Sequence, residues 1–268
     1  MIPLRDNNPT SSFPIVTIAL IVVNFLIFFA PMSPIDKAYY EMIPADVTSG
    51  QEHVGLLEQD KDGGLHFTPA PLSVVARTVQ QSQNYDPVLP TLQPTWLTIF
   101  TSMFLHANFL HVGGNMLFLW IFGNNVEDAL GKVRYLLFYL GCGFAAALAQ
   151  IAIDPGSLIP TLGASGAIAG VMGAYIVMWP RARVTTIITA LFIWFVRDIS
   201  AFWVLGFWIA LQIFEGVYGL SGLSTGGVAV FAHIGGFFIG ILLVLIMGGR
   251  KLGAQQIRTA GVSRLPRY

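Results

Sequence analysis

Six long apolar segments constrain the fold of this chain more than any other feature of its sequence. They cover approximately residues 13–30, 112–128, 134–153, 163–179, 201–218 and 229–247. A helix needs about 20 mostly apolar residues to cross the ~30 Å hydrocarbon core of a bilayer, and each segment approaches that length. The chain is 54% hydrophobic and 10% charged, whereas soluble domains carry roughly 25% charged residues. The sequence therefore predicts an all-α membrane protein, a bundle of six transmembrane helices in contact with the lipid bilayer.

The positions of lysine and arginine orient these predicted helices. In membrane proteins, basic residues concentrate in the cytoplasmic loops. Here they precede the first segment, lie between the second and third and between the fourth and fifth, and follow the sixth, at positions 5, 132, 134, 181, 183, 197, 250, 251, 258, 264 and 267. The loops 154–162 and 219–228 contain neither Lys nor Arg. Both termini are therefore expected in the cytoplasm.

A further apolar run, residues 184–196, is expected to lie at the membrane interface. It is too short to span, and counting it as a crossing would place the basic C-terminal tail opposite the other basic loops. The first segment is expected to be a retained helix, because no clear small-residue cleavage site precedes Pro31. The short N-terminus and the six-span layout favour the bacterial plasma (inner) membrane.

Residues 31–95 differ in composition from the rest of the chain, with eight acidic residues against two lysines and one arginine. They are interpreted as an extracytoplasmic polar insertion between the first and second helices, and Asp62-Gly63-Gly64 within it predicts the turn of a hairpin or a loop. Residues 96–110 mix apolar and polar side chains and are expected at the membrane surface. The predicted organisation is a cytoplasmic N-terminus (1–12), the first helix (13–30), the insertion (31–95), a core of the surface segment and five helices (96–247), and a basic cytoplasmic tail (248–268).

Charge and cysteine content exclude several other classes of protein. The net charge of zero argues against a nucleic-acid partner. Cys142 is the only cysteine, so neither an intrachain disulfide nor a cysteine-based metal cluster can form.

Ser165 is the first candidate for chemistry within the apolar segments. It occurs in Gly163-Ala164-Ser165-Gly166 at the outer start of the fourth segment. The N-terminus of a helix presents free backbone N–H groups and a positive dipole, which can stabilise an anion. The alternative is that these small residues serve only close helix packing.

His233 is the second candidate, near the start of the sixth segment. At about 100° per residue, Gly236 and Gly240 share its helix face, so the face with the imidazole can approach a neighbouring backbone closely. A histidine facing the bundle can also be structural, a proton relay or a metal ligand. The fourth and sixth segments run in the same direction, however, which places Ser165 and His233 at similar depth.

A serine hydroxyl is a poor nucleophile until a nearby base accepts its proton, and histidine is the usual base. Ser165 and His233 can supply these two roles. No carboxylate occurs between Val228 and Met247, and Glu215 is expected away from the pair, toward the other end of the helices or in the outer loop. The sequence therefore favours a catalytic dyad over a triad.

His111 and Asn115 are candidate donors to the oxyanion that such a serine would create. They are spaced i, i+4 at the outer start of the second segment, so they project from one helix face at the depth of Ser165. Zinc binding by His106 and His111 is the competing interpretation. It is disfavoured because the spacing is i, i+5 and no H-E-x-x-H string or adjacent acidic ligand is present. We expect neither a metal nor another cofactor.

These motifs together resemble the rhomboid family of intramembrane serine proteases. The resemblance rests on His106-(4)-His111-(3)-Asn115, then Gly163-Ala164-Ser165-Gly166, then Ala232-His233-(2)-Gly236-(3)-Gly240, in that order over residues 96–247. It implies a six-helix core that cleaves membrane-protein substrates in or beside their transmembrane segments, without metal or nucleotide.

By this resemblance, Ser165 is the nucleophile, His233 the general base and acid, and His111 and Asn115 are oxyanion donors, while His106 has a structural role. Many members have a Trp-Arg pair in the surface loop, whereas Leu97 follows Trp96 here. The anchoring of that loop is therefore expected to differ. The resemblance leaves the role of the insertion and the oligomeric state open.

Two other function classes remain from the sequence. A catalytically silent rhomboid-like protein would bind membrane clients, but both Ser165 and His233 are retained. A transporter using histidines as proton carriers would need paired intramembrane carboxylates or an inverted repeat, and neither is evident. Four aromatic residues of the fifth segment are candidates for a gate or for lipid contact, namely Phe202, Trp203, Phe207 and Trp208, and the loop 219–227 is a candidate lid.

Overall fold

The computed structural model consists of a helical bundle with two small antiparallel sheets, and it describes residues 1–59, 65–81, 85–89, 94–190, 193–220 and 229–260. The helices of the bundle are α1 (Ile15–Phe28), α6 (Phe109–Phe118), the π-helix η3 (Leu119–Gly123), α7 (Asn124–Leu130), α8 (Lys132–Ile153), α9 (Ser165–Met178), α10 (Ala201–Leu220), α11 (Val230–Ile246) and α12 (Gly249–Thr259). Before α6 lie α2 (Pro34–Ala38), α3 (Pro44–Ser49), α4 (Leu72–Gln81), η1 (Thr95–Leu97), α5 (Thr98–Thr101) and η2 (Ser102–Phe104). The strands are β1 (Ile2–Asp6), β2 (Gly55–Gln59), β3 (Leu65–Pro69), β4 (Tyr85–Val88), β5 (Arg183–Ala190) and β6 (Ile193–Ser200).

Helices occupy all six apolar segments, although only some are long enough to cross a membrane by themselves. Among the described residues, α8 and the segment Ala201–Gly219 of α10 are each long and apolar enough, and α11 with α12 makes a third span if this bent pair is one unit. The helices α1 and α9 are apolar but shorter, with 14 residues each. The six-span topology therefore stays a prediction.

The prediction of an all-α fold is confirmed only in part, because the described chain is mostly helical but also contains two three-stranded sheets. The apolar run 184–196 lies in the β5–β6 hairpin, whose β5 strand also pairs with β1 near the N-terminus. Its sequence Val-Thr-Thr-Ile-Ile-Thr is a run of β-branched residues, which favours strand over helix. The second sheet has the order β3-β2-β4 and lies within residues 31–95. Asp62-Gly63-Gly64 connects its antiparallel pair β2 and β3 and falls outside the described residues.

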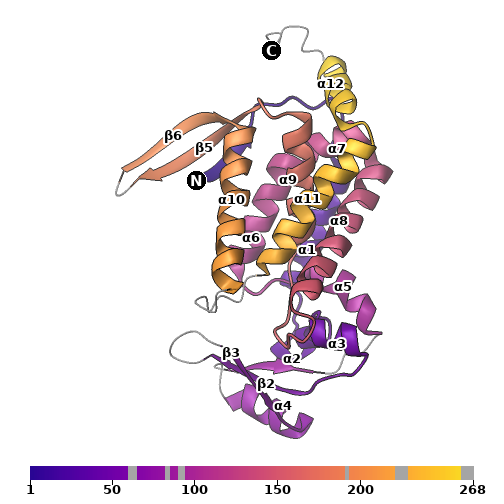
Figure 1. Ribbon diagram of the computed structural model, residues 1–268, viewed down its shortest axis with the longest axis vertical. Coiled ribbons are helices and arrows are strands. Elements are labelled where there is room, and N and C mark those ends of the chain that lie inside the picture. Colours follow the sequence, from indigo (N-terminus) through magenta and orange to yellow (C-terminus); the bar gives the residue numbers. More distant parts are fainter. Residues whose placement is uncertain (60–64, 82–84, 90–93, 191–192, 221–228, 261–268) are drawn as a thin grey trace.

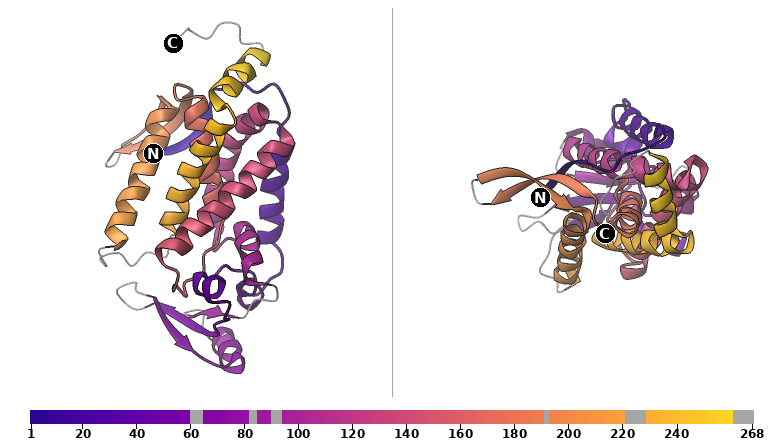
Figure 2. Two further views of the ribbon diagram at one scale, coloured as in Figure 1. Left: turned by 45° about the vertical axis from the view of Figure 1, so that its right-hand side comes forward. Right: turned by 90° about the horizontal axis from the view of Figure 1, so that it is seen from above.

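The two sheets lie toward opposite ends of the bundle (Figures 1 and 2). The β5–β6 hairpin projects from the bundle near the end that carries α12. The sheet β3-β2-β4 lies with α2, α3 and α4 beyond the other end. The segment around α3 is joined to the loop after α8 by backbone hydrogen bonds: Met42 and Thr161 exchange a pair, and the Ala45 N–H donates to the Ser157 carbonyl at 3.0 Å.

Helix α9 lies in the middle of the bundle and contacts α11 through backbone atoms. A Cβ added at Gly236 would lie 2.1 Å from the carbonyl oxygen of Gly166, and one added at Gly240 would lie 2.1 Å from that of Gly170. One added at Gly173 would meet the Phe237 carbonyl oxygen at 2.2 Å. The expected close approach on the His233 face of α11 is thereby confirmed, and only glycine permits it.

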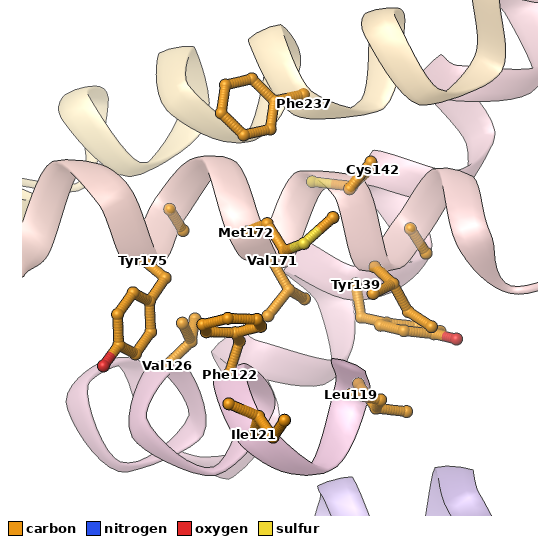
Figure 3. Packing of buried hydrophobic residues seen from close by; sticks show 14 of the residues in the cluster. Leu119, Ile121, Phe122, Val126, Tyr139, Cys142, Val171, Met172, Tyr175 and Phe237 are labelled. Atoms are coloured by element: carbon orange, nitrogen blue, oxygen red, sulfur yellow. The ribbon is translucent and has the colours of Figure 1, made fainter. Parts of the chain in front are cut away.

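Bulky residues fill the space around this glycine contact. Figure 3 shows Phe237 of α11 on one side of α9 and Phe122 of η3 on the other, with Met172 between the helices. Tyr135, Tyr139 and Tyr175 are fully buried in the same core. Small residues bring the backbones together on one face of α9, and large residues fill the core on its other faces.

A buried carboxylate fixes the N-terminus of α1. Glu127 of α7 is 1% exposed and accepts hydrogen bonds from the backbone N–H groups of Val16 and Thr17 at 3.0 and 2.7 Å. It also accepts one from the Thr17 hydroxyl at 2.7 Å. A carboxylate at a helix N-terminus binds free N–H groups and the positive end of the dipole, so this contact joins α1 to the core.

Asp6 anchors β1 to the same end of the bundle. Its Oδ2 accepts from the Tyr175 hydroxyl at 2.6 Å and from the Asn125 amide at 2.8 Å. Burial raises the pKa of the Asp6 carboxyl from 3.8 to about 6, although these hydrogen bonds act in the opposite direction. The strand therefore holds a carboxyl group whose charged form costs free energy in the folded state.

We predict that Gly240→Ala destabilises the fold, because its methyl group would force the α9 and α11 backbones apart. Overpacking of this kind costs about 1–3 kcal/mol, which exceeds the gain of up to ~1 kcal/mol in helix propensity from Gly to Ala. The midpoint of thermal unfolding in detergent should fall by roughly 3 °C or more. The matched control is Gly141→Ala on α8, where a Cβ meets nothing within 4 Å. An equal midpoint for the two variants would contradict the close contact.

We also predict that Asp6→Asn flattens the dependence of stability on pH. Because the folded-state pKa is raised, the contribution of Asp6 is most favourable below pH 3.8 and is lost as the pH rises through about 6. Asparagine keeps an acceptor oxygen without the charge, so the variant should be more stable than the wild type at pH 7.5, by the order of 1–2 kcal/mol. Thermal unfolding at pH 5.0 and 7.5 measures this, with the exposed Asp154→Asn as the control. A wild-type advantage at pH 7.5 would contradict it.

Candidate active site

Ser165 is the first residue of α9. Gly163, two residues before it, has a backbone conformation that favours glycine. Gly163 has φ +118°, in the region that side-chain-bearing residues rarely adopt, and its N–H donates to the Ser102 carbonyl at 2.9 Å. The N-cap residue Ala164 gives the helix no side-chain cap. The first backbone N–H groups of α9 therefore have no partner within the helix or from the cap side chain, as the sequence indicated for an anion-stabilising end.

Ser165 and His233 meet across the α9–α11 contact. The Ser165 Oγ and the His233 Nε2 are 2.7 Å apart, although 68 residues separate them in the sequence. Gly166 and Gly236 stand next to this pair at the first of the close backbone contacts. A hydroxyl within hydrogen-bonding distance of an imidazole nitrogen can pass its proton to that nitrogen and act as a nucleophile.

Two side chains of α10 hold the other side of the His233 ring. The His233 Nδ1 is 2.5 Å from the Gln212 Oε1, and the Trp208 ring centroid is 5.7 Å from that of His233. The Gln212 Nε2 in turn donates to the Glu215 Oε2 at 3.2 Å. Sequence reasoning missed Gln212 because it considered only carboxylates as a third group. A polar residue within a mostly apolar helix was the signal that could have identified it.

The expected location of Glu215 was wrong. It lies at the same end of the bundle as His233 and lines the same cavity. The reason is the direction of α10, which starts at the end that carries the β5–β6 hairpin and finishes at the other end of the bundle (Figure 1). Its Gln212 contacts His233, which contacts Ser165. The last turns of α10 are therefore level with the first turn of α9.

His111 and Asn115 project from the start of α6 toward the backbone that precedes Ser165. A Cβ at Gly163 would lie 2.8 Å from the His111 Nε2 and 3.6 Å from the Asn115 Nδ2. Helix α6 begins at Phe109, three residues earlier than the predicted segment, with Asn108 as its N-cap. The four residues predicted for the site, Ser165, His233, His111 and Asn115, all line one cavity.

His106 supports Asn115. The Asn115 Nδ2 donates to the His106 Nε2 at 2.9 Å, and His106 is 2% exposed. Burial, together with the neighbouring His111, lowers the pKa of His106 to about 4, so the ring is neutral at physiological pH and can accept this bond. Among the described residues, no group of three or more His, Cys, Asp or Glu side chains is arranged to hold a metal ion.

A second glutamine outside the sequence-based prediction secures the start of α11. The Gln150 Oε1 of α8 accepts from the Ala232 N–H at 3.2 Å, and its side chain also lines the cavity. The same N–H also donates to the Ala229 carbonyl at 3.1 Å, so Gln150 shares this donor in the first turn of α11. This bond fixes the turn that carries His233.

The cavity has a volume of about 870 Å³ and lies among α6, α8, α9, α10, α11 and the loop 154–162. This volume falls within the range of ligand sites in proteins. Trp208 lines it, whereas the other three gate candidates, Phe202, Trp203 and Phe207, are exposed on α10. The predicted lid lies mostly in residues 221–228, outside the described part of the chain.

The family model described as the Rhomboid domain matches residues 93–250. This range contains all of the residues discussed for the site, while the domain bounds expected from the sequence stay a prediction.

Several curated proteins are similar to this chain. Rhomboid-like protein 11, chloroplastic, from Arabidopsis thaliana is 30% identical over 162 residues, 58% of this chain and 53% of that protein. Rhomboid protein 1, mitochondrial, from Saccharomyces cerevisiae is 31% identical over 156 residues, 54% of this chain and 40% of that protein. Rhomboid protease GluP from Bacillus subtilis is 32% identical over 165 residues, 60% of this chain and 28% of that protein. The matched part of the chain thus spans about half or less of the length of these relatives.

We predict that a fluorophosphonate probe labels Ser165 covalently, because the neighbouring imidazole can accept the hydroxyl proton. Labelling should disappear in Ser165→Ala and fall by about 100-fold or more in rate in His233→Ala. In-gel fluorescence and mass spectrometry of the labelled peptide measure the two effects. Ser157→Ala is the matched control, since Ser157 lines the same cavity without a histidine partner in the structure. Labelling that persists in Ser165→Ala would show that Ser165 is not the reactive serine.

Proposed function

Because the chain belongs to the rhomboid family, we propose that it is an intramembrane serine endopeptidase that hydrolyses membrane-protein substrates in or next to their transmembrane segments. The observation that carries this proposal is the 2.7 Å contact between the Ser165 Oγ and the His233 Nε2 in a cavity between apolar helices. Polar side chains inside such a bundle cost free energy, so their presence there indicates a functional site.

In the proposed reaction, the Ser165 Oγ attacks the carbonyl carbon of the substrate peptide bond while His233 accepts the hydroxyl proton. The resulting tetrahedral intermediate collapses, the C–N bond breaks, and the protonated His233 delivers its proton to the leaving amine. An acyl-enzyme on Ser165 remains. Water then attacks this ester with His233 as the base, which releases the acid and restores the hydroxyl.

Three groups are proposed to bind the oxyanion: the Ser165 backbone N–H, His111 and the Asn115 amide. The Asn115 Nδ2 carries two N–H bonds and uses one of them on His106, which leaves the other for a ligand. The turn at Gly163 brings backbone, imidazole and amide within a few ångströms of one another. A donor of this kind contributes about 3–4 kcal/mol to stabilisation of the transition state.

A substrate helix must unwind before its peptide carbonyl can reach Ser165, since helical backbone groups are already paired and shielded. The cavity and the free end of α9 offer a polar place for the unwound segment within the bilayer. As a member of this family, the chain is an integral membrane protein. We propose the predicted topology for it, with six spans and both termini in the cytoplasm of a bacterium, and with residues 31–95 as the insertion on the other side.

The alternative is a catalytically silent member that binds membrane clients without cleaving them. The curated relatives include proteins named rhomboid-like as well as proteins named as proteases. The close contact between Ser165 and His233 favours the protease.

Cleavage of a transmembrane reporter by the purified chain in proteoliposomes tests the proposal. We expect cleavage by the wild type and a loss of about 1,000-fold or more in kcat in Ser165→Ala and His233→Ala, because each variant removes one half of the nucleophile–base pair. The control Ser157→Ala leaves the nucleophile–base pair intact and should retain the cleavage that both of those variants lose. Binding of the reporter without cleavage by any of the proteins would favour the client-binding alternative, and equal cleavage by all of them would refute the assignment.

A further inference from the structure

Gln212 occupies a position that neither the sequence nor the two-residue mechanism explains. It lies in the mostly apolar helix α10, three residues before Glu215, and is 9% exposed, and a buried primary amide needs partners for its polar atoms. It has two: the His233 Nδ1 at 2.5 Å and the Glu215 Oε2 at 3.2 Å. The His233 ring is thus held between Ser165 of α9 and Gln212 of α10.

The two partners fix the orientation of the amide. The Glu215 carboxylate has only acceptor oxygens, so the Gln212 group that faces it must be the NH₂ group. The carbonyl oxygen Oε1 then faces His233. The amide cannot turn over without opposing an oxygen to the Glu215 carboxylate.

The orientation of the amide in turn fixes the proton on the imidazole. The Gln212 Oε1 carries no hydrogen, so the proton in this contact must lie on the His233 Nδ1. In a neutral imidazole the other nitrogen then carries the lone pair, and that nitrogen is Nε2 at 2.7 Å from the Ser165 Oγ. This is the tautomer that can accept the serine proton.

We propose that Gln212 is a positioning residue for His233: with Glu215 behind it, it selects the Nδ1–H tautomer and holds the ring toward Ser165. The inference rests on the proposed function, since it assigns a third and a fourth member to the same site. It also extends the expected dyad to a hydrogen-bonded chain of serine, histidine, glutamine and glutamate, with the last two supplied by α10.

Gln212 is also expected to affect the charge that develops on His233 during the reaction. When His233 accepts the serine proton, the ring becomes positive at a half-buried position between apolar helices. The Gln212 carbonyl dipole favours that charge, whereas His111, the titratable group on α6 that faces the site, opposes it when protonated. Loss of Gln212 should therefore affect the chemical step more than substrate binding.

The test compares three variants of the full chain in proteoliposomes, measured by kcat and KM on the transmembrane reporter. Gln212→Met keeps the length of the side chain and removes both polar atoms. The exchange variant Gln212→Glu/Glu215→Gln keeps an acceptor oxygen for the His233 Nδ1, an amide next to it and the same net charge. Leu211→Met is the matched control, an exposed position on the same turn of α10.

We expect Gln212→Met to lower kcat at least about 10-fold with KM within about twofold of the wild type, because the productive tautomer is no longer selected. The exchange variant should recover most of this loss, and Leu211→Met should match the wild type. Gln212→Met should not lower kcat further when His233→Ala is already present. A purely structural role for Gln212 would predict no recovery in the exchange variant.

The pH profile of kcat gives a second measurement, which does not depend on the folding of Gln212→Met. A carboxylate against the His233 Nδ1 stabilises the protonated ring, so the acidic limb of the profile should move upward by about one pH unit in the exchange variant. An unchanged limb, wild-type kcat in a folded Gln212→Met, or no recovery by exchange would overturn the inference while cleavage by the wild type continued. Absence of Ser165-dependent cleavage by the wild type would instead overturn the proposed function.

Discussion

The close contact between the α9 and α11 backbones is the constraint on which the rest of the structure depends. Lipid tails are as apolar as leucine, so helices in a bilayer gain little from burying apolar surface and associate through close packing instead. Gly166, Gly170 and Gly173 on α9 meet Gly236, Phe237 and Gly240 on α11 in this way. Because peptide groups rather than side chains set the separation of the two helices, the distance between Ser165 and His233 is built into the backbone.

Polar side chains on the surrounding helices complete this arrangement at both ends of the bundle. At one end, Glu127 and Asp6 join α1 and β1 to the core. At the other, Gln150 holds the first turn of α11, and His106 holds Asn115. Buried polar groups are costly when they lack partners, so each bond both satisfies its groups and selects one packing of the helices.

The sequence predicted the elements that follow simple patterns. Apolar length located the helices, and the spacing of His233, Gly236 and Gly240 identified the face of α11 that contacts α9. The strands β5 and β6 were missed because length was used to reject a span without asking what a β-branched run would form. The partner of the His233 Nδ1 was missed because an amide was not considered beside the carboxylates. The fold of residues 31–95 depends on long-range pairing between short strands, which local patterns do not specify.

The hydrogen bonds between Met42 and Thr161 show that the region matched by the family model is not the whole of the packed structure. The region recognisable as rhomboid begins at residue 93, yet the loop that forms one wall of the cavity is paired with Met42, which lies before that boundary. Helix α1 and strand β1 also contribute bonds to the core. The region matched by the family model is therefore smaller than the set of residues that hold the core together. A version of this chain trimmed to its family boundaries would keep every residue of the site and lose part of the framework that gives the site its shape.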